Sequence, residues 1–260
     1  LEACENGETK VVQLLLERCN SEESRLNIKD EYGNTAFMMA CIYGHKDVVQ
    51  LLLDHSDPNI ELNAKEVDGM TAFMFACQEG HTDVVQLLLD HSEKIELNAR
   101  NNEGRTAFMV ACYNGHKDVV QLLLDHSQRI DLNARTNKGN TAFMWACLKG
   151  HKGVVKLLLD HSDKIELNAR GNNGRTAFMW ACYKGHKDVV QLLLDHSNRI
   201  ELNARRDNSM TAFMWACFFG HKDVVKLLLE CSDFVDTNIP DNIPISKYLN
   251  LKLHLMRVQK

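Results

Sequence analysis

The sequence of 260 residues predicts an all-α protein built from stacked helix–turn–helix repeats. Each repeat carries two short stretches of helical apolar periodicity with a glycine between them. The string Thr-Ala-Phe-Met recurs with a period of 36 residues once and 35 thereafter, beginning at Thr35, Thr71, Thr106, Thr141, Thr176 and Thr211. Self-similarity at such a period is typical of solenoids, in which neighbouring repeats bury a common core.

The first helix of each repeat has clear start and stop signals, as residues 137–170 illustrate. Gly139 supplies a turn position that tolerates a positive φ. The hydroxyl of Thr141 is then placed to cap the free amides of a first helix. We expect this helix to run to about Lys149 and to end at Gly150.

The second helix of the same repeat is expected from about Lys152 to His161. Its apolar residues recur at the i, i+1, i+4, i+5 spacing of one buried face, namely Val154, Val155, Leu158 and Leu159. Residues 162–170 then form an extended or turn segment. Helices of this length are too short to be stable alone, so each repeat must bury its apolar face against the next.

The repeat also contains a family signature. It reads Gly-Asn-Thr-Ala-Phe-Met-Trp-Ala-Cys, followed by Gly-His-Lys, Val-Val-x-Leu-Leu-Leu and Leu-Asn-Ala. This pattern resembles the ankyrin repeat, although Ala stands where that family has Pro, Met where it has His, and the loop before Leu-Asn-Ala is about two residues longer. The resemblance implies an ankyrin-repeat solenoid of stacked helix–turn–helix units with β-turn fingers.

We expect residues 1–260 to form a single ankyrin-repeat domain. The expected divisions are a partial first repeat at 1–29, full repeats at 30–65, 66–100, 101–135, 136–170, 171–205 and 206–240, and a degenerate C-terminal capping helix at 241–260. Pro240 and Pro244 interrupt the pattern just before the cap. Because Leu1 aligns with the middle of a first helix, we expect the chain to be a piece of a longer protein.

The composition excludes several classes of protein. Apolar residues make up 45% and charged residues 25% of the chain, as in soluble globular proteins. No apolar run approaches the roughly 18 residues of a membrane span, so we expect no membrane insertion. The net charge of −5 argues against nucleic acid as a partner. Reduced cysteines and the lack of a signal segment predict an intracellular, cytoplasmic location, and we expect a monomer.

Nine cysteines could suggest zinc or disulfides, but seven of them are copies of one repeat position. These seven follow the first-helix alanine: Cys4, Cys41, Cys77, Cys112, Cys147, Cys182 and Cys217. Equivalent positions in a stack of helices are roughly 8–10 Å apart, which is too far for a disulfide. We therefore expect buried, reduced thiols.

Eleven of the twelve histidines are repeated in the same way. Six follow the inter-helix glycine, and the resemblance implies that they tie the turn: His45, His81, His116, His151, His186 and His221. Five end second helices, where a donor suits the free carbonyls: His55, His91, His126, His161 and His196.

The recurrent Asp-His-Ser triplet has the letters of a hydrolase triad, but consecutive helical residues do not face each other. A zinc site would need four convergent ligands, whereas these histidines occur one per repeat. We therefore expect no catalytic residue, no metal site and no cofactor, and the protein is not expected to be an enzyme.

Positions that vary between repeats are the candidates for binding, because the constant positions hold the fold. The resemblance implies that the two residues before the inter-helix glycine, and the residue before the capping threonine (as at Met70 and Met210), line a concave groove. The predicted partner-binding residues at these positions are Tyr43, Arg105, Tyr113, Asn114, Leu148, Lys149, Arg175, Tyr183, Lys184, Phe218 and Phe219. Tyrosine and arginine are enriched at binding hot spots.

A basic column, named here the ladder, consists of Lys29, Lys65, Arg100, Arg135, Arg170 and Arg205. Its four arginines are also predicted to bind the partner. Spaced about 10 Å apart, the ladder could meet an acidic side chain at about every third residue of an extended peptide. The alternative is internal pairing with the finger carboxylates Glu31, Asp68, Glu103 and Asp207.

One further first-helix column is predicted to pack between repeats, although its indole edges could also reach the groove. It consists of Met39, Phe75, Val110, Trp145, Trp180 and Trp215.

The sequence therefore predicts a non-catalytic scaffold that binds a protein or peptide partner, with an extended acidic or phosphorylated segment as the preferred ligand. Two alternatives stay open. The chain could be the ankyrin segment of a larger enzyme or channel whose active domain lies elsewhere, or a consensus-like or designed solenoid without a natural ligand. Repeats 101–135 and 171–205 differ at only six positions, which favours the latter, whereas the insertion near Pro58 argues against it.

Overall fold

The computed structural model describes residues 1–18, 25–55, 60–206 and 209–238. These residues form helices joined by turns, with no strand among them, which confirms the predicted all-α class. The chain forms two compact units, residues 1–137 and 138–260. The expected cap at 241–260 lies outside the described residues, and the single domain stays a prediction.

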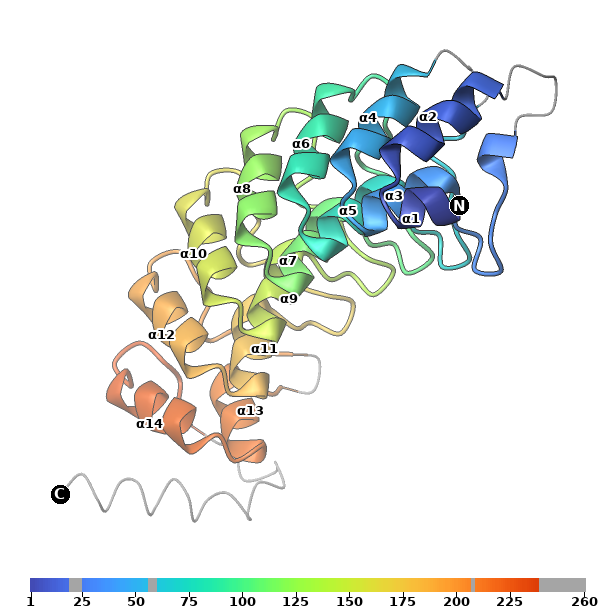
Figure 1. The fold of residues 1–260 in the computed structure, drawn as a ribbon. Helices are drawn as coiled ribbons and strands as arrows, with labels where there is room; N and C mark the ends of the chain where they lie inside the picture. Colours follow the sequence, from blue (N-terminus) through green and yellow to red (C-terminus); the bar gives the residue numbers. More distant parts are fainter. Residues whose placement is uncertain (19–24, 56–59, 207–208, 239–260) are drawn as a thin grey trace. The chain divides into compact units, whose positions relative to one another are not determined.

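The first unit contains four helix pairs among its described residues. Their bounds are α1 Glu2–Glu5, α2 Thr9–Arg18, α3 Ala36–Ile42, α4 Lys46–Asp54, α5 Ala72–Glu79, α6 Thr82–Asp90, α7 Ala107–Asn114 and α8 Lys117–Asp125, with a 3-10 helix at Arg25–Asn27. The odd-numbered helices pack side by side in one layer and the even-numbered helices in another (Figure 1). We call these the first-helix and second-helix layers.

The second unit repeats this arrangement with three helix pairs in its described part. Their bounds are α9 Ala142–Lys149, α10 Lys152–Asp160, α11 Ala177–Lys184, α12 Lys187–Asp195, α13 Ala212–Phe218 and α14 Lys222–Glu230. Helix α11 packs against both α9 and α13, and α12 packs against both α10 and α14. The predicted bounds of the sample repeat agree with α9 and α10 to within one residue.

The capping signals act as the sequence predicts. The Thr141 hydroxyl accepts a hydrogen bond from the Met144 amide at 3.4 Å, and the same bond recurs in all six copies. Gly150 closes α9 with a φ of 77°, a left-handed conformation that glycine adopts without steric cost. The two signals fix where each first helix starts and stops.

The core is made of the constant apolar columns. The first helices contribute Phe, Met, Ala and Cys, and the second helices contribute the Val-Val and Leu-Leu pairs. The largest fully buried side chains include five copies of one position: Phe73, Phe108, Phe143, Phe178 and Phe213. Because these columns fill the space between the layers, variable residues at the ends of the first helices, such as Tyr43 and Lys149, are left exposed.

β-turn fingers precede the first helices, as predicted. In the finger before α11, the Gly174 amide donates to the Gly171 carbonyl at 2.8 Å, and the Gly171 amide donates to the Arg175 carbonyl at 3.0 Å. The Asn172 amide donates to the carbonyl of Lys138 in the preceding finger at 3.1 Å. Each such finger is therefore held by its own turn and by its neighbour.

Candidate functional site

The inter-helix histidine joins one repeat to the repeat before it. His186 donates from Nε2 to the Leu148 carbonyl at 2.9 Å, and His221 donates to the Tyr183 carbonyl at 2.8 Å. Equivalent bonds occur at His45, His81 and His116. The side-chain hydrogen bond that the resemblance implied is thus present, and it is made to the end of the preceding repeat's first helix. The bond holds the variable end of one first helix in register with the next repeat.

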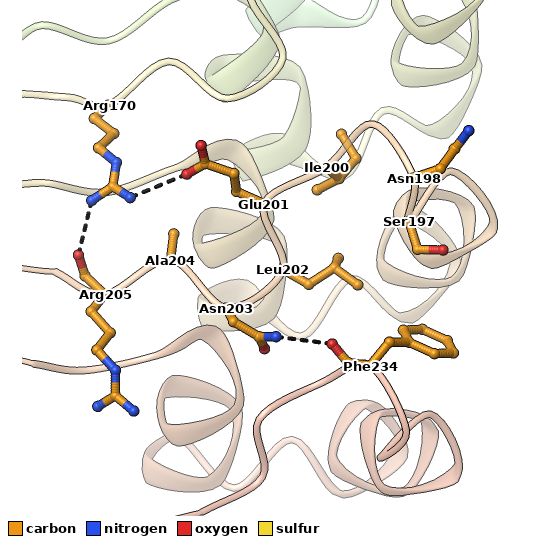
Figure 2. Close-up of a pocket in the computed structure, with 10 residues that line it drawn as sticks. All are labelled: Arg170, Ser197, Asn198, Ile200, Glu201, Leu202, Asn203, Ala204, Arg205 and Phe234. Atoms are coloured by element: carbon orange, nitrogen blue, oxygen red, sulfur yellow. Dashed lines mark hydrogen bonds and ion pairs between the residues drawn. The ribbon is translucent and has the colours of Figure 1, made fainter.

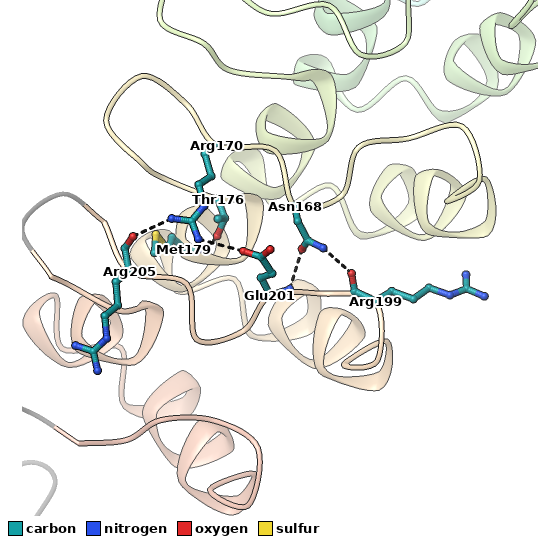
Figure 3. A network of polar contacts seen from close by, with 7 residues as sticks. All are labelled: Asn168, Arg170, Thr176, Met179, Arg199, Glu201 and Arg205. Carbon is teal, nitrogen blue, oxygen red and sulfur yellow. Dashed lines mark hydrogen bonds and ion pairs between the residues drawn. The ribbon is translucent and has the colours of Figure 1, made fainter.

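The asparagine of Leu-Asn-Ala clamps the following repeat. Asn168 donates to the Arg199 carbonyl at 2.9 Å and accepts from the Glu201 amide at 2.8 Å (Figure 3). Asn63, Asn98 and Asn203 make the same pair of bonds. This role was not predicted from the sequence, although the constancy of the column was its signal.

The ladder residues are exposed, but the structure gives most of them bonds within the protein. Arg170 donates to the Arg205 carbonyl at 3.1 Å and pairs with Glu201 at 3.1 Å (Figure 3). Arg205 pairs with Asp236 at 2.8 Å. In the first unit, three ladder side chains donate a hydrogen bond to the backbone carbonyl of the next ladder residue: Lys29, Lys65 and Arg100.

Among the described residues, the carboxylates paired with Arg170 and Arg205 thus include Glu201 and Asp236, which belong to connecting segments and were not among the finger carboxylates that the sequence suggested. Glu103 instead pairs with Arg105, and Asp207 lies outside the described residues. Exposed pairs of this kind contribute little to stability. A role of the ladder in partner binding stays a prediction.

A pocket of about 650 Å³ lies where the ladder meets the connecting segment (Figure 2). Its lining consists of Arg170, residues 197–198, residues 200–205 and Phe234. A smaller pocket of about 340 Å³ is lined by Ile60–Ala64 and Lys94, the equivalent residues of an earlier repeat. Because the pocket recurs, it follows from the path of the connecting segment and does not mark a unique site.

The predicted partner-binding residues of the first unit are partly solvent-accessible. Tyr43 is 49% exposed, and its hydroxyl donates to Glu5 at 3.2 Å. Arg105 lies 5.3 Å from the centre of the Tyr113 ring and forms an ion pair with Glu103 at 2.6 Å. Asn114 is exposed. Tyr113 therefore sits beside a cation that already has a carboxylate partner.

The second unit gathers a larger set of rings, named here the aromatic cluster: Trp180, Tyr183, Trp215, Phe218 and Phe219. Tyr183 is at its centre, with ring centroids 5.6 Å from both Trp180 and Trp215 and 4.6 Å from Phe219. Phe218 and Phe219 are 39% and 43% exposed. Rings from α11, α13 and the turn after α13 thus form one continuous, partly exposed apolar surface.

Three cations border the aromatic cluster. The Arg175 guanidinium lies 4.3 Å from the Trp180 ring centre and 5.2 Å from that of Trp215. Arg206 lies 5.7 Å from the Trp215 ring, and Lys184 lies 5.3 Å from the Tyr183 ring. Burial lowers the pKa of Arg175, and the charge of Arg206 lowers this pKa further. Each of these cations is attracted to the negative face of the neighbouring ring.

Several predicted positions need correction. Met70 and Met210 are buried, so they do not belong to an open surface. Packing alone does not describe Trp180 and Trp215, because both indoles are only half-buried and contact the exposed rings. Arg206 was missed. Among the other predicted residues of this unit, Leu148 is half-buried and Lys149 and Lys184 are exposed.

The Asp-His-Ser triplet lies at the end of the second helix. In the copy at Asp90, the carboxylate accepts from Gln86 at 2.7 Å, and His91 donates from Nδ1 to the Leu87 carbonyl at 2.9 Å. Both bonds stay within the end of one helix, as expected for a C-terminal capping histidine.

The column cysteines are buried free thiols, as predicted. Burial raises the pKa of Cys41, Cys77 and Cys147, so these thiols stay protonated and unreactive at neutral pH. We expect iodoacetamide to leave the seven column cysteines of the native protein unmodified, so that the protein takes up at most two labels, at Cys231 and at Cys19, which lies outside the described residues. Intact mass spectrometry checks this, with all nine cysteines labelled in denaturant. A third label on folded protein would contradict the burial of the column.

Two further properties concern the described residues alone. Within residues 1–18, 25–55, 60–206 and 209–238, no group of three or more His, Cys, Asp or Glu side chains could hold a metal ion. In the same part of the chain, every helix is too short or too polar to cross a membrane.

Comparison with known families agrees with this architecture. The family model for ankyrin repeats (3 copies) matches residues 1–101, 56–134, 93–171 and 162–241. A search for curated relatives found no match. Ankyrin repeats are generally protein–protein interaction modules and are typically non-catalytic. With its stacked helix pairs, β-turn fingers and a family match over residues 1–241, the chain belongs to the ankyrin-repeat family.

Proposed function

We propose that the protein is a non-catalytic interaction scaffold that binds a protein partner through the variable side chains of its first-helix layer. The observation that carries this proposal is the aromatic cluster with its bordering cations. Large rings and arginines at partly exposed positions are the residue types that dominate binding energy at interfaces. The constant apolar columns are buried and hold the fold, so the variable positions of the first-helix layer are the ones available to a partner.

The preferred partner is an extended segment with acidic or phosphorylated residues. Support for this choice comes from the cations beside the rings, Arg105 in the first unit and Arg175, Lys184 and Arg206 in the second. Charge complementarity of this kind raises the association rate and selects against basic partners. We further propose that the protein acts as a monomer inside the cell.

A pull-down with the intact chain tests this function. The test variant replaces Tyr113, Tyr183 and Phe218 by alanine, which removes one ring from each of three repeats. We expect the partner captured by the intact chain to be lost, because truncating central aromatic anchors weakens binding by about tenfold or more per hot spot. Thermal unfolding of the variant shows whether its repeats remain folded.

A matched control replaces the equivalent second-helix residues of the same three repeats, Gln121, Gln191 and Lys226, by alanine. These positions lie in α8, α12 and α14, and alanine is the residue best suited to a helix interior. We expect this variant to retain the partner. Capture by the first-helix variant at the level of the intact chain would overturn the proposed function.

A further inference from the structure

Arg175 is equivalent to Arg105, which lies two repeats earlier. Unlike Arg105, Arg175 has no carboxylate beside it. Residues 101–135 and 171–205 differ at six positions, and one of these differences is Glu103 against Asn173. Glu103 forms an ion pair with Arg105 at 2.6 Å. Asn173 instead accepts a hydrogen bond from the Arg175 amide at 3.3 Å and offers no negative charge. Among the described residues, the Arg175 guanidinium makes no ion pair.

A second cation, Arg206, adds to the positive charge around Arg175. Arg206, from the next finger, donates from Nε to the Asn173 carbonyl at 3.0 Å, which places its guanidinium over Trp215 beside Arg175. The pKa of Arg175 is lowered first by burial and then by the charge of Arg206. A partly desolvated cation beside a second cation gains more from a negative ligand than an exposed cation does.

The surroundings determine what kind of negative ligand fits. Arg175 lies against three rings, with its guanidinium 4.3 Å from Trp180, 5.4 Å from Tyr183 and 5.2 Å from Trp215. Cation–π contacts supply no hydrogen-bond acceptor for the guanidinium N–H groups, and the fork that these groups form matches a planar carboxylate. The exposed rings of Phe218 and Phe219 adjoin the same surface and offer contact to an apolar neighbour of that carboxylate.

We propose that Arg175 and Arg206 bind an aspartate or glutamate side chain of an extended partner segment. The two guanidinium groups lie against the rings of Trp180, Tyr183 and Trp215. In the partner segment, the residue next to the bound aspartate or glutamate is aromatic. This inference rests on the proposed function and names the chemistry of its ligand. The chain's own residues 239–260 are a poor occupant by charge, since they carry four Lys or Arg residues against one Asp.

The test uses a display library of random nonapeptides selected on the full-length chain. We expect the enriched peptides to carry Asp or Glu next to an aromatic residue. Binding of a synthesised selected peptide is then measured from tryptophan fluorescence in a Trp145→Phe background, because Trp180 and Trp215 are the remaining tryptophans. Phe75 shows that phenylalanine is accepted in this column.

Asn173→Glu is the decisive variant, because it restores the carboxylate that Glu103 supplies in the earlier repeat. We expect it to weaken peptide binding about tenfold or more, since the ligand loses a charge-assisted hydrogen bond to Arg175. Asn173→Gln introduces a side chain of the same size as glutamate but without its charge. This variant should bind the peptide with an affinity within about twofold of that of the intact chain. Asn198→Asp adds one negative charge on a connecting segment, where Asp163 stands one repeat earlier, and should also bind within about twofold.

The outcomes separate this inference from the proposed function. Enrichment of peptides that lack a carboxylate, or unchanged affinity of Asn173→Glu, would overturn the Arg175 site while leaving a binding role for the rings. Enriched peptides that bind the Tyr113, Tyr183 and Phe218 alanine variant as tightly as the intact chain would overturn the proposed function itself. An equal loss with Asn198→Asp would mean that only net charge matters, which also contradicts the site.

Discussion

Phe178→Ala is expected to lower the free energy of unfolding by about 3–5 kcal/mol, because a large ring is removed from a close-packed core. Phe178 is 1% exposed and lies in α11, which packs against α9 on one side and α13 on the other. In a repeat stack each unit depends on its neighbours, so a cavity at this position weakens two interfaces. Urea unfolding followed by circular dichroism measures the change.

Phe178→Leu is the matched control for this prediction. Leucine keeps most of the apolar volume, so we expect a loss of only about 1 kcal/mol. A loss for the alanine variant no larger than that of the leucine variant would show that the site collapses around the missing ring. The column of buried phenylalanines would then not be the main support of the stack.

Gly150→Ala is expected to cost about 2–4 kcal/mol, from two separate sources. The first is the left-handed backbone of Gly150, with a φ of 77°. The second is a clash, because a Cβ atom there would lie 2.6 Å from Nδ1 of His186. The ring must then move, and its hydrogen bond to the Leu148 carbonyl is lost.

Gly220→Ala separates these two sources. Gly220 has nearly the same φ, 73°, but no atom of the described residues lies within 4 Å of the point that a Cβ atom would occupy. We expect only the cost of the left-handed backbone, about 1–2 kcal/mol. Equal losses at Gly150 and Gly220, measured by urea unfolding, would contradict the role of the histidine in joining the repeats.

Local signals in the sequence were sufficient to predict the fold. Thr141, Gly150 and the Val154–Val155 pair each act within one helix or one turn, and six copies of the same pattern leave little ambiguity. The burial of the cysteine column followed from the same repetition. These features depend on residues close in sequence, so periodicity and capping rules identify them.

Contacts between repeats were harder to predict. His186 and Arg170 both donate to backbone carbonyls of another repeat, and every residue offers the same acceptor, so no side-chain pattern identifies the partner. The exposure of Trp180 depends on how rings from two repeats meet. The replacement of Glu103 by Asn173 was visible in the sequence, but its meaning required the ion pair between Glu103 and Arg105.

The most direct test of binding through the first-helix layer is a titration of the captured partner against two purified variants. One carries alanine at Tyr113, Tyr183 and Phe218, and the other carries alanine at Gln121, Gln191 and Lys226. We predict that the affinity falls about tenfold or more for the first-helix variant and stays within about twofold for the second-helix variant. Unchanged affinity of the first-helix variant, or an equal loss for both variants, would contradict the proposal.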